Sequence, residues 1–435
     1  MTPLLWHAEN GVGRYGALTR LSWPGATYHT PLAYKNVKLP GTWQSVLAEE
    51  PANCWYNQKK QFQIIMADDP TSSNHLPPEL IIDIFLRLPV KTLIRCTSVC
   101  KQWYVLIRNP NFSTSHFNSY NNNHNNQYIL IGNTNICHVV CDKTFQLIHT
   151  VQAPFHLSPN RKYSLNFIGS SNGLLCLAPG LEYTLGNDVY IWNPSVRACK
   201  KLPVSRFSDH EFRGVVSRLG FAFHESSNDY KVVRLVYFSG SCSFPFVDVV
   251  PLVEIYSLRT DSWKVVSAEV PPVMIQSVAT FNDGVFYWMG FKSVTDDPME
   301  NYILSYDLDD GRFREIEQPS VDFPFSLLAV KGSSSGSLYS VYSKFFGGQN
   351  DILVLWKMDE FNGGWMKAYT IQCNRGVWAT LGFTTSGKFL FANLEKKLVS
   401  FDLETLETEV HDLGIALNRS AVDVNYMESL LFFDL

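Results

Sequence analysis

Two glycine-flanked motifs in the second half of the chain have spacings typical of catalytic or phosphate-binding loops. Residues 332–336 (GSSSG) fit G-x-S-x-G, in which a serine nucleophile stands between a strand and a helix. Residues 382–388 (GFTTSGK) nearly match a loop whose backbone N–H groups and lysine hold phosphate oxygens. Both motifs are followed by strand-like residues instead of a helix, and Phe389 replaces the magnesium-binding Ser or Thr. We therefore interpret both motifs as turns of β-hairpins.

The other groups of ionisable residues lack the partners that catalysis or metal binding requires. The acidic pairs 296–297 and 309–310 stand in turns, where carboxylates accept hydrogen bonds from local N–H groups. His224-Glu225 has no second histidine at the helical spacing of a zinc protease. Residues 137–141 (CHVVC) have no second ligand pair at matched spacing. We expect no catalytic residue, no metal site and no cofactor.

Composition indicates an intracellular protein of more than one domain. The 435 residues are 46% hydrophobic and 17% charged, which allows a large core. With 36 basic and 40 acidic residues the formal charge is −4, which argues against a nucleic-acid partner. The nine cysteines form no C-x-x-C pair, so we expect reduced thiols in the cytoplasm or nucleus. No signal peptide or stretch of ~18 apolar residues is present in the sequence, so we expect no membrane partner.

Residues 76–108 have the hydrophobic period of a compact helical unit. Pro77 and Pro78 suit the start of a helix, whose apolar stripe ends at Pro89. A second helix follows, and Ser98 is a candidate cap for a third helix that ends at Asn109-Pro110. So few residues have no deep interior, which predicts that the unit binds a partner surface. Two apolar residues of the first helix are assigned instead to the unit's own core: Leu80 and Ile81.

Two segments beside this unit lack a regular hydrophobic period. For residues 1–65 two interpretations stay open: the functional chain starts at Met66 and does not contain them, or they form a disordered extension. Residues 118–127 are rich in asparagine and are interpreted as a flexible linker.

Residues 128–435 read as an all-β domain with an internal repeat. Short runs of Val, Ile, Tyr, Phe and Trp alternate with turns. An apolar anchor recurs roughly every 50 residues and, in most repeats, is followed seven positions later by a second large side chain, as across a hairpin. We predict a β-propeller of about six blades, with seven left open. The predicted anchors are Cys141, Trp192, Tyr256, Tyr306, Trp356 and Phe401, facing Ile148, Cys199, Trp263, Phe313, Trp365 and Thr408.

Several of these motifs resemble those of a known family. Residues 76–107 carry LPPEL, IFLRLPVKTL and SVCKQW in the order and spacing of the F-box of ubiquitin-ligase adaptors. NGLLCL at 172–177, WNP at 192–194 and DYKVV at 229–233 are similar to the F-box-associated domain of large plant adaptor families. The resemblance covers residues 75–435 and implies an α+β multidomain chain: a small three-helix F-box (75–117) followed by an all-β propeller-like domain (128–435).

The resemblance also implies partners and docking residues. It implies a non-catalytic adaptor of a Skp–cullin–F-box (SCF) ubiquitin ligase, which binds a Skp-type linker subunit and, through it, cullin and RING subunits. The propeller would hold an unidentified protein substrate. The adaptor would act by positioning this substrate, not by catalysing a reaction itself. The predicted linker-binding residues are Leu76, Pro77, Ile84, Phe85, Leu88, Pro89, Leu93, Val99, Trp103 and Ile107.

Two further functions stay open. A propeller enzyme or small-ligand binder would use residues of the central channel, which the sequence does not identify. A scaffold that binds the linker without joining a ligase is the second. For target binding, the candidate segments are residues 239–251 and 205–214, because specificity in propellers lies in loops between strands.

Overall fold

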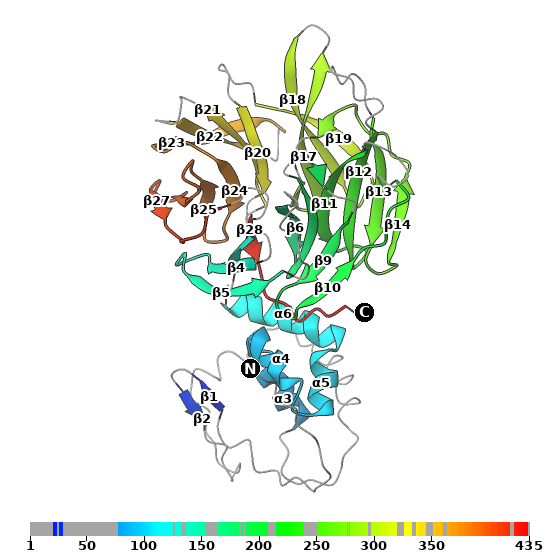
Figure 1. The fold of residues 1–435 in the computed structure, drawn as a ribbon, viewed down its shortest axis with the longest axis vertical. Helices are drawn as coiled ribbons and strands as arrows, with labels where there is room; N and C mark the ends of the chain where they lie inside the picture. Colours follow the sequence, from blue (N-terminus) through cyan, green and yellow to red (C-terminus); the bar gives the residue numbers. More distant parts are fainter. Residues whose placement is uncertain are drawn as a thin grey trace, which may run out of the picture. The chain divides into compact units, whose positions relative to one another are not determined.

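Figure 1 shows a computed structural model of the chain, which divides into two compact units, Met1–Gln61 and Phe62–Leu435. In the first unit the described residues form one antiparallel hairpin, β1 (Leu21–Trp23) with β2 (Ala26–Tyr28). The interpretations of residues 1–65 otherwise fall outside the described residues. The structure describes residues 21–23, 26–28, 77–124, 127–132, 136–153, 164–181, 184–185, 188–207, 215–238, 250–275, 277, 279–294, 297–319, 326–332, 336–344, 351–359, 363–417 and 422–433.

The second unit begins with four described helices. Pro77 precedes the first helix with an extended backbone (φ −53°, ψ 140°), and Pro78 occupies its first turn, where no backbone donor is needed. The second helix likewise follows a proline, Pro89. The helices are α3 (Pro78–Phe85), α4 (Val90–Cys96), α5 (Lys101–Ile107) and α6 (Pro110–His124).

The remaining described strands of this unit form six antiparallel sheets, numbered here as blades 1 to 6. Blade 1 joins β28 (Val422–Tyr426) to β3 (Tyr128–Gly132), β4 (Ile136–Cys141) and β5 (Leu147–Gln152). Blade 2 contains β6 (Ser164–Ser171), β7 (Leu174–Leu181), β8 (Thr184–Leu185), β9 (Tyr190–Asn193) and β10 (Ala198–Lys201). Blade 3 contains β11 (Val215–His224), β12 (Asp229–Phe238), β13 (Leu252–Ser257) and β14 (Ser262–Val266).

The last three blades follow in chain order. Blade 4 contains β15 (Met274–Ile275), β16 (Thr280–Asn282), β17 (Val285–Val294), β18 (Asp297–Asp307) and β19 (Phe313–Glu317). Blade 5 contains β20 (Ser326–Gly332), β21 (Leu338–Lys344), β22 (Asp351–Met358) and β23 (Trp365–Cys373). Blade 6 contains β24 (Ala379–Phe383), β25 (Lys388–Ala392), β26 (Leu398–Asp402) and β27 (Thr408–His411).

The blades form a closed ring. Their innermost strands adjoin in the cycle β28, β6, β11, β16, β20, β24 and back to β28. Blade 1 closes the ring, because β28 from the end of the chain pairs with β3 from the start of the domain. The propeller therefore has six blades, which confirms the predicted number and excludes seven.

The predicted hairpin register is correct in four blades. Trp192 faces Cys199, Tyr256 faces Trp263, Tyr306 faces Phe313 and Phe401 faces Thr408.

The register differs in blades 1 and 5. Trp365 faces Met358, and Trp356 faces Lys367 beyond an irregularity in the ladder. In blade 1, Val140 instead of Cys141 faces the outer strand, with Leu147 opposite it. In blade 1 the seven-residue spacing holds one position earlier than predicted, and in blade 5 the paired strands extend two residues closer to the turn. The irregularities in both ladders lie farther from the turn than these pairs, so they do not explain the errors.

Each hairpin between the two outer strands turns through one residue with positive φ. These angles lie between 47° and 69°, a conformation that favours glycine and is strained for other side chains. The six residues are Phe145, Arg197, Asp261, Gly311, Gly363 and Leu406. A polar side chain at the start of several turns accepts the freed N–H groups, as Asp402 Oδ1 does from Glu404 and Thr405.

The core of the propeller lies between neighbouring blades. Trp192, from blade 2, packs among buried residues of blade 1, and Trp288, from blade 4, packs among buried residues of blade 3. Both indole side chains are almost completely buried. Large aromatic side chains fill the wedge between two twisted sheets, which explains why the repeat is rich in Trp, Tyr and Phe.

Candidate functional site

The helical unit has a small core of its own. Phe85 of α3 packs edge to face on Trp103 of α5, with ring centroids 4.9 Å apart. Leu93 of α4 and Ile107 of α5 are both 0% exposed. The other buried apolar residues of α3 to α5 are Ile82, Leu86, Val90 and Leu106. Three of the predicted docking residues, Phe85, Leu93 and Ile107, therefore lie inside the unit and support its surface from within.

A second set of apolar side chains is exposed. Burying such residues against a partner removes them from water, so exposed apolar residues of a folded unit are candidates for an interaction surface. We call this set the docking surface; it consists of Leu80 (41% exposed), Ile84 (46%), Val99 (47%), Tyr104 (46%) and Val105 (40%). Ile84 and Val99 belong to the predicted linker-binding residues. Leu80 was assigned to the core and is instead exposed, because α3 turns the opposite face, with Ile82 and Phe85, inward.

The remaining predicted docking residues lie at intermediate positions. Leu88, Pro89 and Trp103 are half-buried, and Pro77 is exposed at the start of α3. Leu76 falls outside the described residues. The spacing of apolar residues alone does not distinguish these from the core, because both sets follow the same helical period. The predicted docking residues did not include Tyr104 and Val105, because on α5 these two residues stand in sequence between Trp103 and the buried Leu106.

Two local predictions in this unit are wrong. Ser98 does not cap α5: its hydroxyl donates to the carbonyl of Arg95, and α5 begins after Cys100 without a side-chain cap. The asparagine-rich segment is not a linker over most of its length, since α6 continues to His124. Asn109 starts this helix, because its Oδ1 accepts the N–H of Asn111 at 2.9 Å.

His116 connects α6 to the loop between α3 and α4. Its side chain is fully buried, and Nε2 lies 2.8 Å from the carbonyl oxygen of Leu88. The imidazole stacks on Tyr120, with centroids 5.2 Å apart. Burial lowers the pKa of His116, although the hydrogen bond to Leu88 acts in the opposite direction. The neutral imidazole thus holds α6 against the loop that contains Leu88 and Pro89.

The motifs with catalytic spacing form turns. Thr384 N donates to Lys388 O at 2.9 Å and closes the hairpin between β24 and β25, as expected for residues 382–388. Gly332 ends β20 and β21 begins at Leu338, so no described helix follows the G-x-S-x-G motif, whose serines lie outside the described residues.

Among the described residues no group of three His, Cys, Asp or Glu side chains is placed to hold a metal ion. The described cysteines are free, and burial raises the pKa of the Cys137 thiol to about 12. In the described part of the chain, no helix combines the length and hydropathy needed to span a bilayer.

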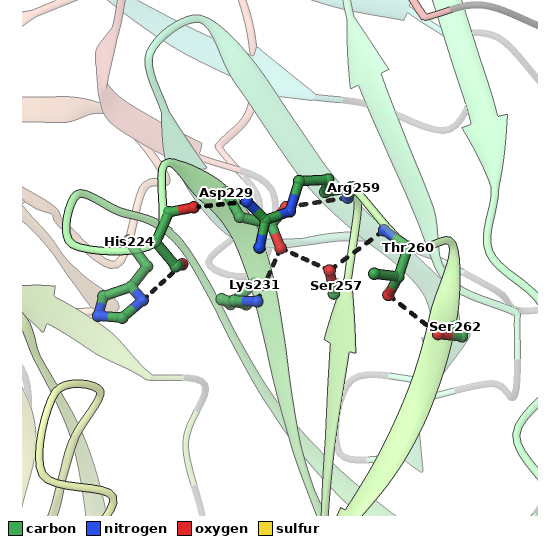
Figure 2. Close-up of polar contacts among 8 residues, drawn as sticks. His224, Asp229, Lys231, Ser257, Arg259, Thr260 and Ser262 are labelled. Atoms are coloured by element: carbon green, nitrogen blue, oxygen red, sulfur yellow. Dashed lines mark hydrogen bonds and ion pairs between the residues drawn. The ribbon is translucent and has the colours of Figure 1, made fainter.

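The DYKVV motif anchors two turns of blade 3 (Figure 2). Asp229 is 3% exposed; its Oδ2 accepts hydrogen bonds from Ser257 Oγ at 2.5 Å and Lys231 Nζ at 2.7 Å, and its Oδ1 accepts one from Arg259 N at 2.9 Å. Burial alone would raise the pKa of Asp229, but these hydrogen bonds together lower it.

A second contact of the same turn reaches blade 4. His224 Nε2 lies 3.0 Å from Oδ1 of Asp309, and its Nδ1 lies 2.8 Å from Ser227 Oγ. Asp309 therefore contacts a neighbouring blade instead of its own turn, whereas Asp310 Oδ1 accepts the N–H of Arg312, as expected for an acid in a turn.

Comparison with known proteins divides the chain into the same two parts, the helical unit and the propeller. A model described as "F-box-like" matches residues 73–118, and one described as "F-box associated beta propeller domain" matches residues 105–429. Among curated relatives, the Arabidopsis thaliana F-box protein CPR1 is 27% identical over 76% of this chain and 82% of its own length. The F-box/kelch-repeat protein At3g23880 from the same plant is 27% identical over 69% of this chain and 80% of its own.

A third Arabidopsis relative, F-box protein At3g07870, is 26% identical over 68% of this chain and 72% of its own length. The propeller model alone spans more than half of the chain and includes all six blades observed in the structure. The chain therefore belongs to the family of F-box proteins that carry a C-terminal F-box-associated β-propeller domain.

Proposed function

We propose that this protein is a substrate adaptor of an SCF-type ubiquitin ligase. Its helical unit binds a Skp-type linker subunit, and its propeller holds a target protein near the ubiquitin-charged enzyme. The observation that carries the proposal is the docking surface, which keeps five large apolar side chains exposed on a unit with a complete small core. Such an adaptor is non-catalytic and acts inside the cell.

The docking surface suits a protein partner better than a small ligand. Its members come from two helices and the turn between α4 and α5, so a partner that covers all of them must span several elements. Each member is 40–47% exposed, so a partner that covers them buries several large apolar side chains at once. Half-buried Leu88, Pro89 and Trp103 adjoin this set in sequence and extend it.

Target binding is assigned to one end of blade 3. The turns held by Asp229 lie at one end of this sheet, and the segments 205–214 and 239–251 leave from the other end. A buried ion pair supports that second end: Arg234 Nη1 lies 3.5 Å from Glu254 Oε2, which also accepts a hydrogen bond from Ser205 Oγ at 2.6 Å. A rigid base of this kind suits loops that recognise a partner.

The test is reconstitution with purified subunits. The full chain is mixed with a Skp-type linker, and binding is measured by calorimetry; a cullin–RING core is then added and co-elution is measured. Binding of the linker followed by co-elution with the core supports the adaptor. Binding of the linker without recruitment of the core would instead indicate a scaffold outside the ligase, and no binding of the linker would refute the proposal.

A further inference from the structure

The segment that follows β28 contacts both the helical unit and blade 2 (Figure 1). We call residues 427–433 the clasp. Ser429 and Leu430 in its centre are 0% exposed, and Phe433 near its end is 9% exposed within the core between blades 2 and 3. A segment without regular secondary structure needs other partners for its backbone groups when it is buried. The described contacts show where these partners lie.

Asn193 supplies most of the contacts on the side of blade 2. Its Nδ2 lies 3.1 Å from the carbonyl oxygen of Ser429, 3.0 Å from Ser429 Oγ and 2.9 Å from the carbonyl oxygen of Leu431. Ser195, two residues later, accepts the N–H of Ser429 at 3.3 Å and shares a hydrogen bond of 2.7 Å with the hydroxyl of Tyr426. Two residues of the clasp, Ser429 and Leu431, are thus hydrogen-bonded to a single turn.

Glycine at position 173 makes room for the clasp. A Cβ atom there would lie 2.5 Å from Cβ of Ser429 and 2.8 Å from the carbonyl oxygen of Met427. The φ angle of Gly173 is +80°, which also favours glycine. Two turns of blade 2, one at Gly173 and one at Asn193, therefore shape the seat of the clasp.

The helical unit contacts the other side of the clasp. The hydroxyl of Ser113 in α6, 2% exposed, donates to the carbonyl oxygen of Leu430 at 3.1 Å. The guanidinium carbon of Arg108, at the end of α5, lies 4.4 Å from the ring centroid of Phe432. The same short segment thus touches α5, α6 and blade 2.

The residue type at position 193 is specific to this blade. In the corresponding turns of blades 3, 4 and 6 the first residue is Ser257, Asp307 or Asp402, and its oxygen accepts N–H groups of its own turn. Asn193 keeps that role, since its Oδ1 accepts the N–H of Ser195 at 3.0 Å. Its amide nitrogen adds donors that a carboxylate does not have, and these donors all point to the clasp.

We propose that Asn193 is a positioning residue: through the clasp it fixes the helical unit on the propeller and so sets the distance between ligase and target. The inference rests on the proposed adaptor function, because a fixed distance matters when one end is bound to a ligase. Positioning of this kind raises the effective concentration of the target at the transfer site.

Two substitutions of matched chemistry test the proposal in the full chain. Asn193→Asp keeps the oxygen that accepts the N–H of Ser195 but removes the donors to the clasp. Asp402→Asn is the reverse exchange at the same turn position of blade 6, away from the clasp. Ser113→Ala removes only the hydrogen bond between α6 and the clasp. Hydrogen exchange of residues 427–433, small-angle scattering and affinity for the linker are measured for each variant.

The expected pattern separates the clasp from general stability. In Asn193→Asp the clasp amides exchange their hydrogens about tenfold faster than in the wild type. In Asp402→Asn the exchange rates of the clasp amides stay at the wild-type values. Asn193→Asp and Ser113→Ala both increase the radius of gyration, while their affinity for the linker stays at the wild-type value. The ratio of clasp exchange rates between Asn193→Asp and the wild type, measured at the same pH, falls as the pH is lowered, because a protonated carboxyl group donates again.

Unchanged clasp exchange in Asn193→Asp would overturn the proposal. If Asn193→Asp unfolds, the Ser113→Ala variant tests the proposal instead, because it leaves the contacts between the clasp and blade 2 intact. A radius of gyration equal to that of the wild type in Ser113→Ala would overturn the proposal. Failure of the adaptor function itself is a different outcome, since it would show as no linker binding by the wild type.

Discussion

Replacement of Ile84 by lysine tests whether the docking surface binds the linker. The side chain is 46% exposed on α3, so the substitution leaves the core formed by Phe85 and its neighbours intact. If the linker covers the exposed part, about 80 Å² of apolar surface leaves the water on binding, which contributes about 2 kcal/mol at 25 cal/mol per Å². A charged side chain there loses this contribution and adds a desolvation cost. The affinity therefore falls at least about 30-fold.

The assay is isothermal titration of the linker into the full chain, with circular dichroism to confirm the fold. Leu147→Lys is the matched control, because Leu147 is 50% exposed on β5 of the propeller, outside the docking surface. This control is expected to bind the linker like the wild type. Val99→Lys repeats the experiment on the turn before α5, where the side chain is 47% exposed. Wild-type affinity in both Ile84→Lys and Val99→Lys would refute the assignment of this surface.

Two further predictions concern pH and stability. Asp229→Asn lowers the free energy of unfolding of the propeller by about 2 kcal/mol at pH 7, because hydrogen bonds to a buried carboxylate weaken. The pKa of Asp229 is lowered in the folded state, so this contribution is complete above the unfolded pKa of about 3.9 and is lost as pH falls through the folded pKa. Urea unfolding at pH 7 and pH 3 checks it: a difference between variant and wild type that is as large at pH 3 as at pH 7 contradicts the role of the charge. For His116, burial lowers the pKa, so the unfolded chain takes up the proton first and the helical unit loses stability as pH falls below about 6.5, by at most about 1.4 kcal/mol per pH unit. Urea unfolding at pH 7 and pH 5, followed by the helical signal in circular dichroism, measures this, and His116→Gln, which does not titrate, should show a smaller dependence.

The sequence predicted the propeller well because its signals are local and repeated. A hairpin fixes which two side chains face each other, so the pairs Tyr306 with Phe313 and Phe401 with Thr408 follow from spacing. Spacing alone does not show which residue is the anchor or how far the paired strands extend toward the turn, which explains the errors at Cys141 and Trp356.

The docking surface was predicted only in part, since a helical period shows an apolar face but not what covers it. Leu80 and Phe85 have the same sequence signal, yet one is exposed and the other lies under Trp103.

The Asn-rich part of α6 shows a different limit of sequence analysis. Asparagine is a poor helix former, and residues 118–124 carry little apolar content, so composition favours a linker. The helix forms because its first turns are held from outside: Phe112 and His116 are buried, and Ser113 binds the clasp from the far end of the chain. Contacts between residues more than 300 positions apart leave no trace in local composition.

The composite blade 1 has a consequence for the order of synthesis. A ribosome releases the helical unit and β3 long before β28, and the ring cannot close until residues 422–426 emerge. Until then β3 has an unpaired edge, which exposes a pairing site to other chains and to chaperones. A transcript cut short in blade 6 would yield a nascent product that still carries the docking surface but has an open ring. Under the proposed adaptor function, such a product would occupy linker subunits without delivering a target, and so would compete with the intact protein.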